Sequence, residues 1–149
     1  MLIQFSVENF LSIKDNVVLS LLASKDNEHP EHLIVDGNKK HLKSAVIYGA
    51  NASGKSNVLN AFWFMVNYVL TSHNQQLHKA IERSPFKFDC ETPSRPSCFE
   101  AIFTANGIRY AYGFSVTDKA VIEEYLYYYP MAGRRSFERQ NTNNFRFTC

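Results

Sequence analysis

A chain of 149 residues is long enough for one compact domain and too short for two of ordinary size. Its residues are 45% hydrophobic, 14% aromatic and 20% charged, so burial of apolar surface can offset the entropy lost on folding, which excludes a wholly disordered chain. The formal charge of +2 is far below the basic excess of a dedicated nucleic-acid binder. We expect a single globular domain over residues 1–149.

The chain shows no targeting signal that we recognise. Residues 1–8 alternate polar and apolar side chains, unlike a signal peptide. The most apolar stretch, residues 58–70, contains two asparagines and is shorter than the roughly 18 residues that a membrane span needs. The cysteines are odd in number and lack C-x-x-C spacing, which argues against a disulfide framework or a structural zinc site and predicts free thiols in the cytoplasm. They are Cys90, Cys98 and Cys149.

Strand patterns dominate the N-terminal third. Residues 2–9 place apolar side chains at alternate positions, as in a strand with one buried face. Residues 16–22 predict a second strand, and the short connection at 11–15 favours an antiparallel hairpin. Residues 24–43 are polar and predict a surface loop, with one short strand at 33–35.

The middle of the chain predicts a strand, a helix and a connector. Ala45–Tyr48 is a continuous apolar run that ends at Gly49, as in a central strand covered on both faces. Residues 55–72 lack Gly and Pro and are apolar around nearly the whole circumference, which predicts a buried helix roughly 27 Å long. Residues 73–97 are polar with three prolines and predict a solvated connector, with one short helix at 75–83.

The last third returns to strands. Asn106–Gly107 is a strong tight-turn signal, because both central positions tolerate positive φ. The pattern predicts an antiparallel meander. Its strands are expected at residues 99–104, 108–116, 120–129, 136–139 and 145–148.

One motif carries chemistry. Residues 49–56 read G-A-N-A-S-G-K-S and match G-x-x-x-x-G-K-[ST] in full. A chance match in a chain of this length has a frequency on the order of half a percent. The expected strand before the motif and helix after it supply the context of a phosphate-binding loop, or P-loop. Small residues let backbone N–H groups surround an anion, and the helix adds its positive dipole end.

The residue types define roles within this loop. The Lys55 ammonium would reach the β and γ phosphates, and the Ser56 hydroxyl would help to hold Mg²⁺. Gly54 leaves room that a side chain would fill. The expected nucleotide-binding residues are Gly49, Ala50, Asn51, Ala52, Ser53, Gly54, Lys55, Ser56 and Asn57.

Two other P-loop classes fit less well. A guanine-specific GTPase needs N-K-x-D, but residues 38–41 read N-K-K-H, lack the carboxylate and precede the P-loop. A small-molecule kinase would continue in doubly wound order, whereas a meander is expected here, although Arg134 and Arg135 could imitate its lid. ATP is therefore the favoured nucleotide.

The order of motifs resembles a known family. Residues 7–15 read V-E-N-F-L-S-I-K-D, and residues 47–59 read I-Y-G-A-N-A-S-G-K-S-N-V-L. They resemble the N-terminal lobe of the ABC-type ATPase heads of the RecF, SMC and OLD group, above all bacterial AAA family ATPases of the abortive-infection type. Leu11 stands where RecF and SMC proteins usually have arginine. Residues 110–114 and 123–126 resemble the abortive-infection branch as well.

The resemblance implies an α/β P-loop NTPase, an ABC-ATPase-like N-terminal lobe with a buried P-loop strand and helix and an antiparallel β meander. It also implies ATP with Mg²⁺, a homodimer of heads around two nucleotides, and hydrolysis coupled to DNA or phage sensing, with a nuclease or toxin as a further partner. The Walker B carboxylates and signature segment lie far C-terminal in such proteins. Asp36 precedes the P-loop, and Glu123–Glu124 is explained as well by alternation in an antiparallel strand.

Two functions stay open. The first is an ATPase lobe that belongs to a larger head and hydrolyses ATP only when the missing elements are present. The second is a nucleotide-sensing module that binds ATP to control partner assembly without turnover. Contact with DNA, if any, would involve a basic strip near the C-terminal end, which is more simply explained as a solvated sheet face. The strip comprises Arg134, Arg135, Arg139 and Arg146, opposed by Glu138.

Overall fold

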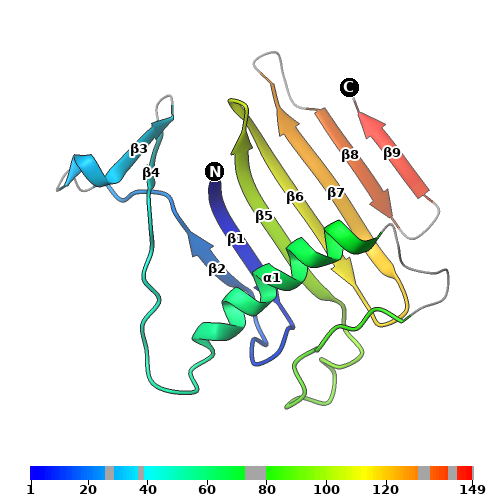
Figure 1. The fold of residues 1–149 in the computed structure, drawn as a ribbon. Helices are drawn as coiled ribbons and strands as arrows, with labels where there is room; N and C mark the ends of the chain where they lie inside the picture. Colours follow the sequence, from blue (N-terminus) through cyan, green and yellow to red (C-terminus); the bar gives the residue numbers. More distant parts are fainter. Residues whose placement is uncertain (26–28, 37–38, 73–79, 131–134, 141–143, 149) are drawn as a thin grey trace.

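The computed structural model describes residues 1–25, 29–36, 39–72, 80–130, 135–140 and 144–148 (Figure 1). An antiparallel sheet in the order β2-β1-β5-β6-β7-β8-β9 carries one helix across one face, and a separate two-stranded hairpin, β3-β4, stands beside it. The sheet strands are β1 (Leu2–Glu8), β2 (Val17–Ser20), β5 (Ser97–Ala105), β6 (Ile108–Val116), β7 (Val121–Tyr129), β8 (Arg135–Gln140) and β9 (Asn144–Thr148). The other elements are η1 (Pro30–His32), β3 (Leu33–Asp36), β4 (Lys39–Leu42) and α1 (Lys55–Thr71).

The N-terminal hairpin is confirmed. β1 pairs antiparallel with β2, and its alternate side chains Phe5 and Val7 are buried, as the sequence pattern predicts. The pairing of β1 with β5 on its other side joins residues that are far apart in the chain, from Leu2↔Phe103 to Glu8↔Cys98. This long-range pairing makes β1 an interior strand of the sheet and leaves β2 at its edge.

The antiparallel meander is confirmed from β5 to β9. Asn106 and Gly107 both have positive φ, 52° and 73°, as the turn between β5 and β6 requires. Across the middle of the sheet the Tyr125 ring lies over Gly113, where an added Cβ would come within 2.5 Å of the ring. This position lets the Tyr125 hydroxyl donate a 2.5 Å hydrogen bond to Glu100, and burial together with this carboxylate raises the pKa of Tyr125.

The hairpin β3-β4 goes beyond the expectation of a loop with one strand. β3 confirms the short strand expected at 33–35, and β4 pairs with it from Leu33↔Leu42 to Asp36↔Lys39. The backbone N–H of Ala23 donates to the backbone carbonyl of Lys40. This bond connects β4 to the chain that follows β2. Of the cysteines, Cys90 and Cys98 are free thiols as expected, and Cys149 lies outside the described residues.

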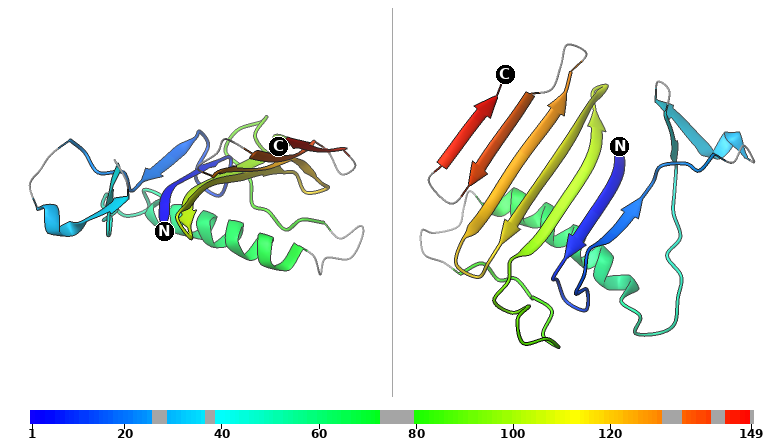
Figure 2. Two further views of the ribbon diagram at one scale, coloured as in Figure 1. Left: turned by 90° about the horizontal axis from the view of Figure 1, so that it is seen from above. Right: turned by 180° about the vertical axis from the view of Figure 1, so that it is seen from behind.

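The helix α1 begins at the expected residue and ends at Thr71, one residue before the expected end, but its expected burial on all sides is wrong. Seen from above, α1 lies along one face of the sheet (Figure 2). Ala61 and Met65 are buried against the sheet, whereas Leu59, Trp63 and Leu70 on the remaining surface are exposed. One layer covers only one side of a helix, so the apolar side chains on its other side stay exposed. The buried core comprises Phe5, Val7, Phe10, Ile13, Ala61, Met65, Ile81, Phe99, Ala101, Phe114 and Val116.

The expected central strand at Ala45–Tyr48 is also wrong. This segment does not form a strand, and Val46 and Tyr48 are 85% and 90% exposed. A strand exists only when a neighbouring strand accepts its backbone hydrogen bonds. The seven sheet strands pair with one another and leave no described strand beside this segment. The P-loop is therefore preceded by extended apolar chain and not by a buried strand.

The expected solvated connector is wrong for its C-terminal part. The Arg83 side chain is only 1% exposed and donates to the carbonyl oxygens of Pro93 and Arg95 and to the carboxylate of Asp118. The buried Asn9 amide donates to the carbonyls of Thr92, Arg95 and Pro96 and accepts from the backbone N–H of Phe86. This network holds the segment against β1. The short helix expected at 75–83 lies mostly outside the described residues, and residues 80–83 are not helical.

Among the described residues, no helix is both long and apolar enough to cross a membrane.

Candidate functional site

The P-loop folds into a tight turn that feeds directly into α1. Ala52 and Gly54 have positive φ, 62° and 89°, and Gly54 is the residue that caps the helix. The backbone N–H of Ser53 donates to Ala50, and that of Asn57 donates to Gly54. The first N–H groups of a helix have no acceptor within the helix, so this end of α1 offers donors and positive potential to an anion. The small residues of the motif make this turn possible.

Lys55 lies across this loop. Its Nζ donates to the carbonyl oxygens of Gly49 at 2.9 Å and Ala50 at 2.6 Å. Both acceptors belong to the turn that the motif predicts to surround phosphates. Phosphate oxygens are charged acceptors and bind an ammonium group more strongly than neutral carbonyls do. An incoming phosphate chain can therefore displace these two bonds, and the ammonium already lies at the loop.

The N-terminal turn contributes a residue to the site. Asn57 Nδ2 donates a 2.7 Å hydrogen bond to Ser12 Oγ, and a Cβ at Gly54 would come within 2.9 Å of the same oxygen. The turn between β1 and β2 thus lies directly against the start of α1. Ser12 stands within the segment quoted for the family resemblance, but the sequence by itself gave it no role. A hydroxyl facing the P-loop is detectable only in the folded chain.

A cavity of about 570 Å³ opens between this turn and the P-loop. It brings together polar side chains from the P-loop and from the N-terminal turn with a few apolar ones. Among the described residues that line it, Asp15 is the only carboxylate. The lining residues are Ser12, Ile13, Lys14, Asp15, Asn16, Val17, Ile47, Tyr48, Ser53, Gly54, Lys55, Val58 and Phe86.

Lys14 at the cavity is held by an ion pair. Its Nζ lies 2.6 Å from Oδ2 of Asp89. The hydrogen bond from Lys14, followed by one from the backbone N–H of Glu91, lowers the pKa of Asp89 to about 2. The same bond raises the pKa of Lys14. The cavity wall therefore carries the ammonium group of Lys14 in addition to that of Lys55. The Asp89 carboxylate balances the charge of Lys14.

The carboxylates considered for metal binding lie elsewhere. Glu123 and Glu124 are on the antiparallel strand β7, and Glu124 accepts a 2.8 Å hydrogen bond from the Tyr112 hydroxyl. Asp36 ends β3 in the separate hairpin. Neither location is part of the cavity beside the P-loop. Ser56, the expected Mg²⁺ ligand, is exposed in the first turn of α1.

The described arginines of the basic strip lie on two neighbouring strands. Arg135 and Arg139 are on β8 and Arg146 is on the neighbouring β9, where it pairs with Glu138. Arg134, considered as a nucleotide-lid residue, lies outside the described residues. Contact of this strip with DNA stays a prediction.

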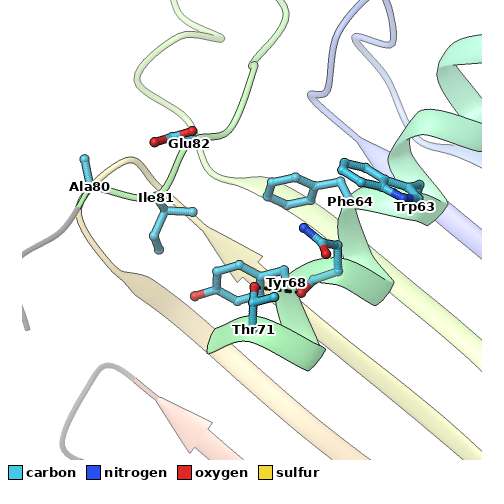
Figure 3. Close-up of a pocket in the computed structure, with 8 residues that line it drawn as sticks. Trp63, Phe64, Tyr68, Thr71, Ala80, Ile81 and Glu82 are labelled. Atoms are coloured by element: carbon cyan, nitrogen blue, oxygen red, sulfur yellow. Dashed lines mark hydrogen bonds between the residues drawn. The ribbon is translucent and has the colours of Figure 1, made fainter. Parts of the chain in front are cut away.

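A second cavity, of about 310 Å³, lies at the other end of α1 (Figure 3). Phe64 and Tyr68 of α1 and Ile81 of the following segment face the same space, and Thr71 donates a hydrogen bond to the backbone of Asn67. It shares no lining residue with the cavity at the P-loop. The described residues that line this cavity are aromatic, apolar and polar, and they include no cluster of metal-binding side chains.

Comparison with known proteins gives one family. No protein with a curated description matches the chain. Residues 44–148 match the model of the family described as "AAA domain, putative AbiEii toxin, Type IV TA system". The match includes the whole P-loop and continues through the meander, and it covers well over half of the chain. The chain therefore belongs to this family of AAA domains, whose P-loop is associated with nucleotide binding and ATPase-like function.

Proposed function

We propose that this chain binds ATP together with Mg²⁺ at the P-loop. The observation that carries the proposal is the position of Lys55, whose ammonium bridges two carbonyls of the loop at the N-terminus of α1. Lys55 would transfer these bonds to the β and γ phosphates, backbone N–H groups of the loop would bind the remaining oxygens, and Ser56 would ligate Mg²⁺. The rest of the nucleotide has space in the adjoining cavity, whose volume of about 570 Å³ lies in the usual range of ligand sites.

We further propose that the chain acts as one lobe of an ATPase head. Exposed apolar surface of this extent marks a surface that other protein covers. Here it comprises the extended segment with Val46 and Tyr48 and the outer surface of α1 with Leu59, Trp63 and Leu70. Hydrolysis would then need a metal-binding carboxylate and a signature segment beyond the elements described here, with two heads as a homodimer around two nucleotides. The family description names a toxin and a toxin–antitoxin system. From this wording we propose a role in anti-phage defence, and we propose DNA, a nuclease or a toxin as partner.

One observation favours the alternative of nucleotide sensing without turnover. Among the described residues that line the cavity, a single carboxylate, Asp15, is available. Water attack on the γ phosphate requires a group that holds the metal and another that orients the water. A module with this site could bind ATP to control partner assembly and leave it intact.

The experiment that tests the proposal is calorimetric titration of ATP into the chain with and without Mg²⁺. Lys55→Ala should weaken binding by about tenfold or more because it removes a charged phosphate ligand, and it should leave the fold intact. Lys43→Ala is the matched control, since this lysine also donates to a backbone carbonyl, that of Glu31, outside the site. Equal affinity of both variants would contradict the P-loop assignment.

Ser56→Ala separates metal binding from nucleotide binding. It should weaken binding mainly in the presence of Mg²⁺, because the hydroxyl is a ligand of the metal and not of the phosphates. Equal losses with and without Mg²⁺ would contradict this role.

A further inference from the structure

The turn before β3 gathers three side chains with metal-ligating atoms. Nδ1 of His29 lies 3.1 Å from Oε1 of Glu31, and Nε2 of His32 lies 3.5 Å from the same oxygen. All three donor atoms lie within 4.8 Å of one another. This group is outside the cavity at the P-loop and shares no residue with it.

We propose that His29, Glu31 and His32 form a binding site for a transition-metal ion of the zinc class. Two imidazole nitrogens and one carboxylate oxygen are a ligand set that Zn²⁺ accepts, with bonds of about 2.0–2.2 Å. In a tetrahedral site with such bonds, neighbouring ligand atoms are about 3.3–3.5 Å apart. The two nitrogen-to-oxygen distances, 3.1 and 3.5 Å, already lie close to that separation. The fourth position would be open to water or to a ligand from another molecule.

The backbone holds the three side chains in place. His29 has a left-handed conformation, with φ 60° and ψ 54°, and Pro30 fixes the first position of the one-turn helix η1. The backbone N–H of His32 donates to the carbonyl of His29 and closes the turn. On the other side Lys43 binds twice, from its Nζ to the Glu31 carbonyl and from its backbone N–H to the His32 carbonyl. A ligand set on an anchored turn loses less entropy on binding than one on a free loop.

The chemistry of the group also suits a cation. Oε1 of Glu31 faces both imidazole rings, so a negatively charged oxygen lies between two nitrogen ligands. The side chains of both histidines are 73% exposed and that of Glu31 is 60% exposed, so a hydrated ion reaches them without any rearrangement of the core. Exposed pairs of this kind add little to stability, so replacement of these side chains should leave the chain folded.

The test is titration of Zn²⁺ into the untagged chain in nucleotide-free buffer, followed by calorimetry. We expect one ion per chain. His29→Ala and His32→Ala should each weaken binding by about tenfold or more. Glu31→Gln keeps the shape of the side chain and should weaken binding too, since it replaces a charged ligand by a poor one.

Two controls keep the proposal falsifiable. The double variant His73→Ala/His78→Ala removes the same number of imidazoles elsewhere in the sequence and should bind as the wild type does. Co²⁺ in place of Zn²⁺ reports the ligand type through its absorption spectrum. Unchanged affinity in the His29→Ala/His32→Ala double variant, or a thiolate charge-transfer band from a cysteine, would overturn the assignment.

Discussion

Asn57 Nδ2 donates a 2.7 Å hydrogen bond to Oγ of Ser12, which lies 45 positions earlier in the chain. The same serine oxygen lies 2.9 Å from the place that a Cβ at Gly54 would occupy. Through these two contacts the turn between β1 and β2 and the start of α1 form one unit. The position of the P-loop therefore depends on the N-terminal hairpin, although the motif itself is entirely local.

A double-mutant cycle of Ser12→Ala and Asn57→Ala measures this link. We expect a coupling of about 0.5–1.5 kcal/mol in the free energy of unfolding, because each single change removes the same hydrogen bond and the second change then loses nothing more from it. Urea denaturation of the four proteins checks this. Strictly additive losses would show that the bond contributes nothing to stability.

Gly54→Ala should harm the site more than Gly107→Ala. Both glycines have positive φ, +89° and +73°, so alanine is strained by about 1–2 kcal/mol at either place. A Cβ at Gly107 meets nothing within 4 Å, whereas one at Gly54 meets the Ser12 hydroxyl. We expect similar strain in urea denaturation but weaker ATP binding only for Gly54→Ala, with partial recovery when Ser12→Ala is added. Equal effects on ATP binding would contradict the close approach.

Arg83→Met should destabilise the fold by about 3 kcal/mol, since the carbonyls of Pro93 and Arg95 each lose a charged donor at about 1–3 kcal/mol. Asp118→Asn is the matched change at the other end of the ion pair. The Asp118 side chain is 61% exposed, so its loss should change stability by less than about 1 kcal/mol. Thermal unfolding of the two variants compares them. Similar losses would mean that the ion pair, and not the carbonyl contacts, holds the segment.

The pair Lys14–Asp89 should make stability depend on acid. The folded-state pKa of Asp89, about 2, lies below its ordinary value of 3.8, so the carboxylate favours the folded chain at all pH values above that range. This contribution disappears as pH falls from about 4 to about 2. In Lys14→Met the pKa of Asp89 should return toward 3.8, as measured by NMR titration of its carboxyl carbon. A pKa that stays near 2 would assign the shift to the backbone hydrogen bonds alone.

We expect these 149 residues to release phosphate from ATP and Mg²⁺ no faster than their Lys55→Ala variant. Asp15 is the one carboxylate among the described residues that line the cavity, and hydrolysis needs both a metal-holding group and a group that orients water. A steady-state phosphate-release assay with both proteins measures this. Turnover that depends on Lys55 would contradict the expectation and would make Asp15, Glu123 and Glu124 the residues to replace next.

Local patterns in the sequence are sufficient to predict most strands and the P-loop. The alternation in β1, the Asn106–Gly107 turn and the run that becomes α1 each express preferences of neighbouring residues, and the structure confirms their places. The eight-residue motif likewise fixes a turn and a helix start with Lys55 beside them. These features depend on contacts within a few positions, which is why a single sequence reveals them.

Three other features were decided only by the tertiary structure: the state of Ala45–Tyr48, the buried face of α1 and the burial of two polar side chains. Each depends on partners that are distant in the chain. Ala45–Tyr48 has the composition of a buried strand, yet its state depends on whether another strand lies beside it, and none among the described strands does. Which surface of α1 is buried depends on the single sheet face that it covers. From their polarity, the side chains of Asn9 and Arg83 would be expected on the surface. They are buried because they donate hydrogen bonds to backbone carbonyls of a segment that forms neither a strand nor a helix. Backbone groups removed from water must be paired by whatever residue the fold brings near, and no local pattern specifies which residue that is.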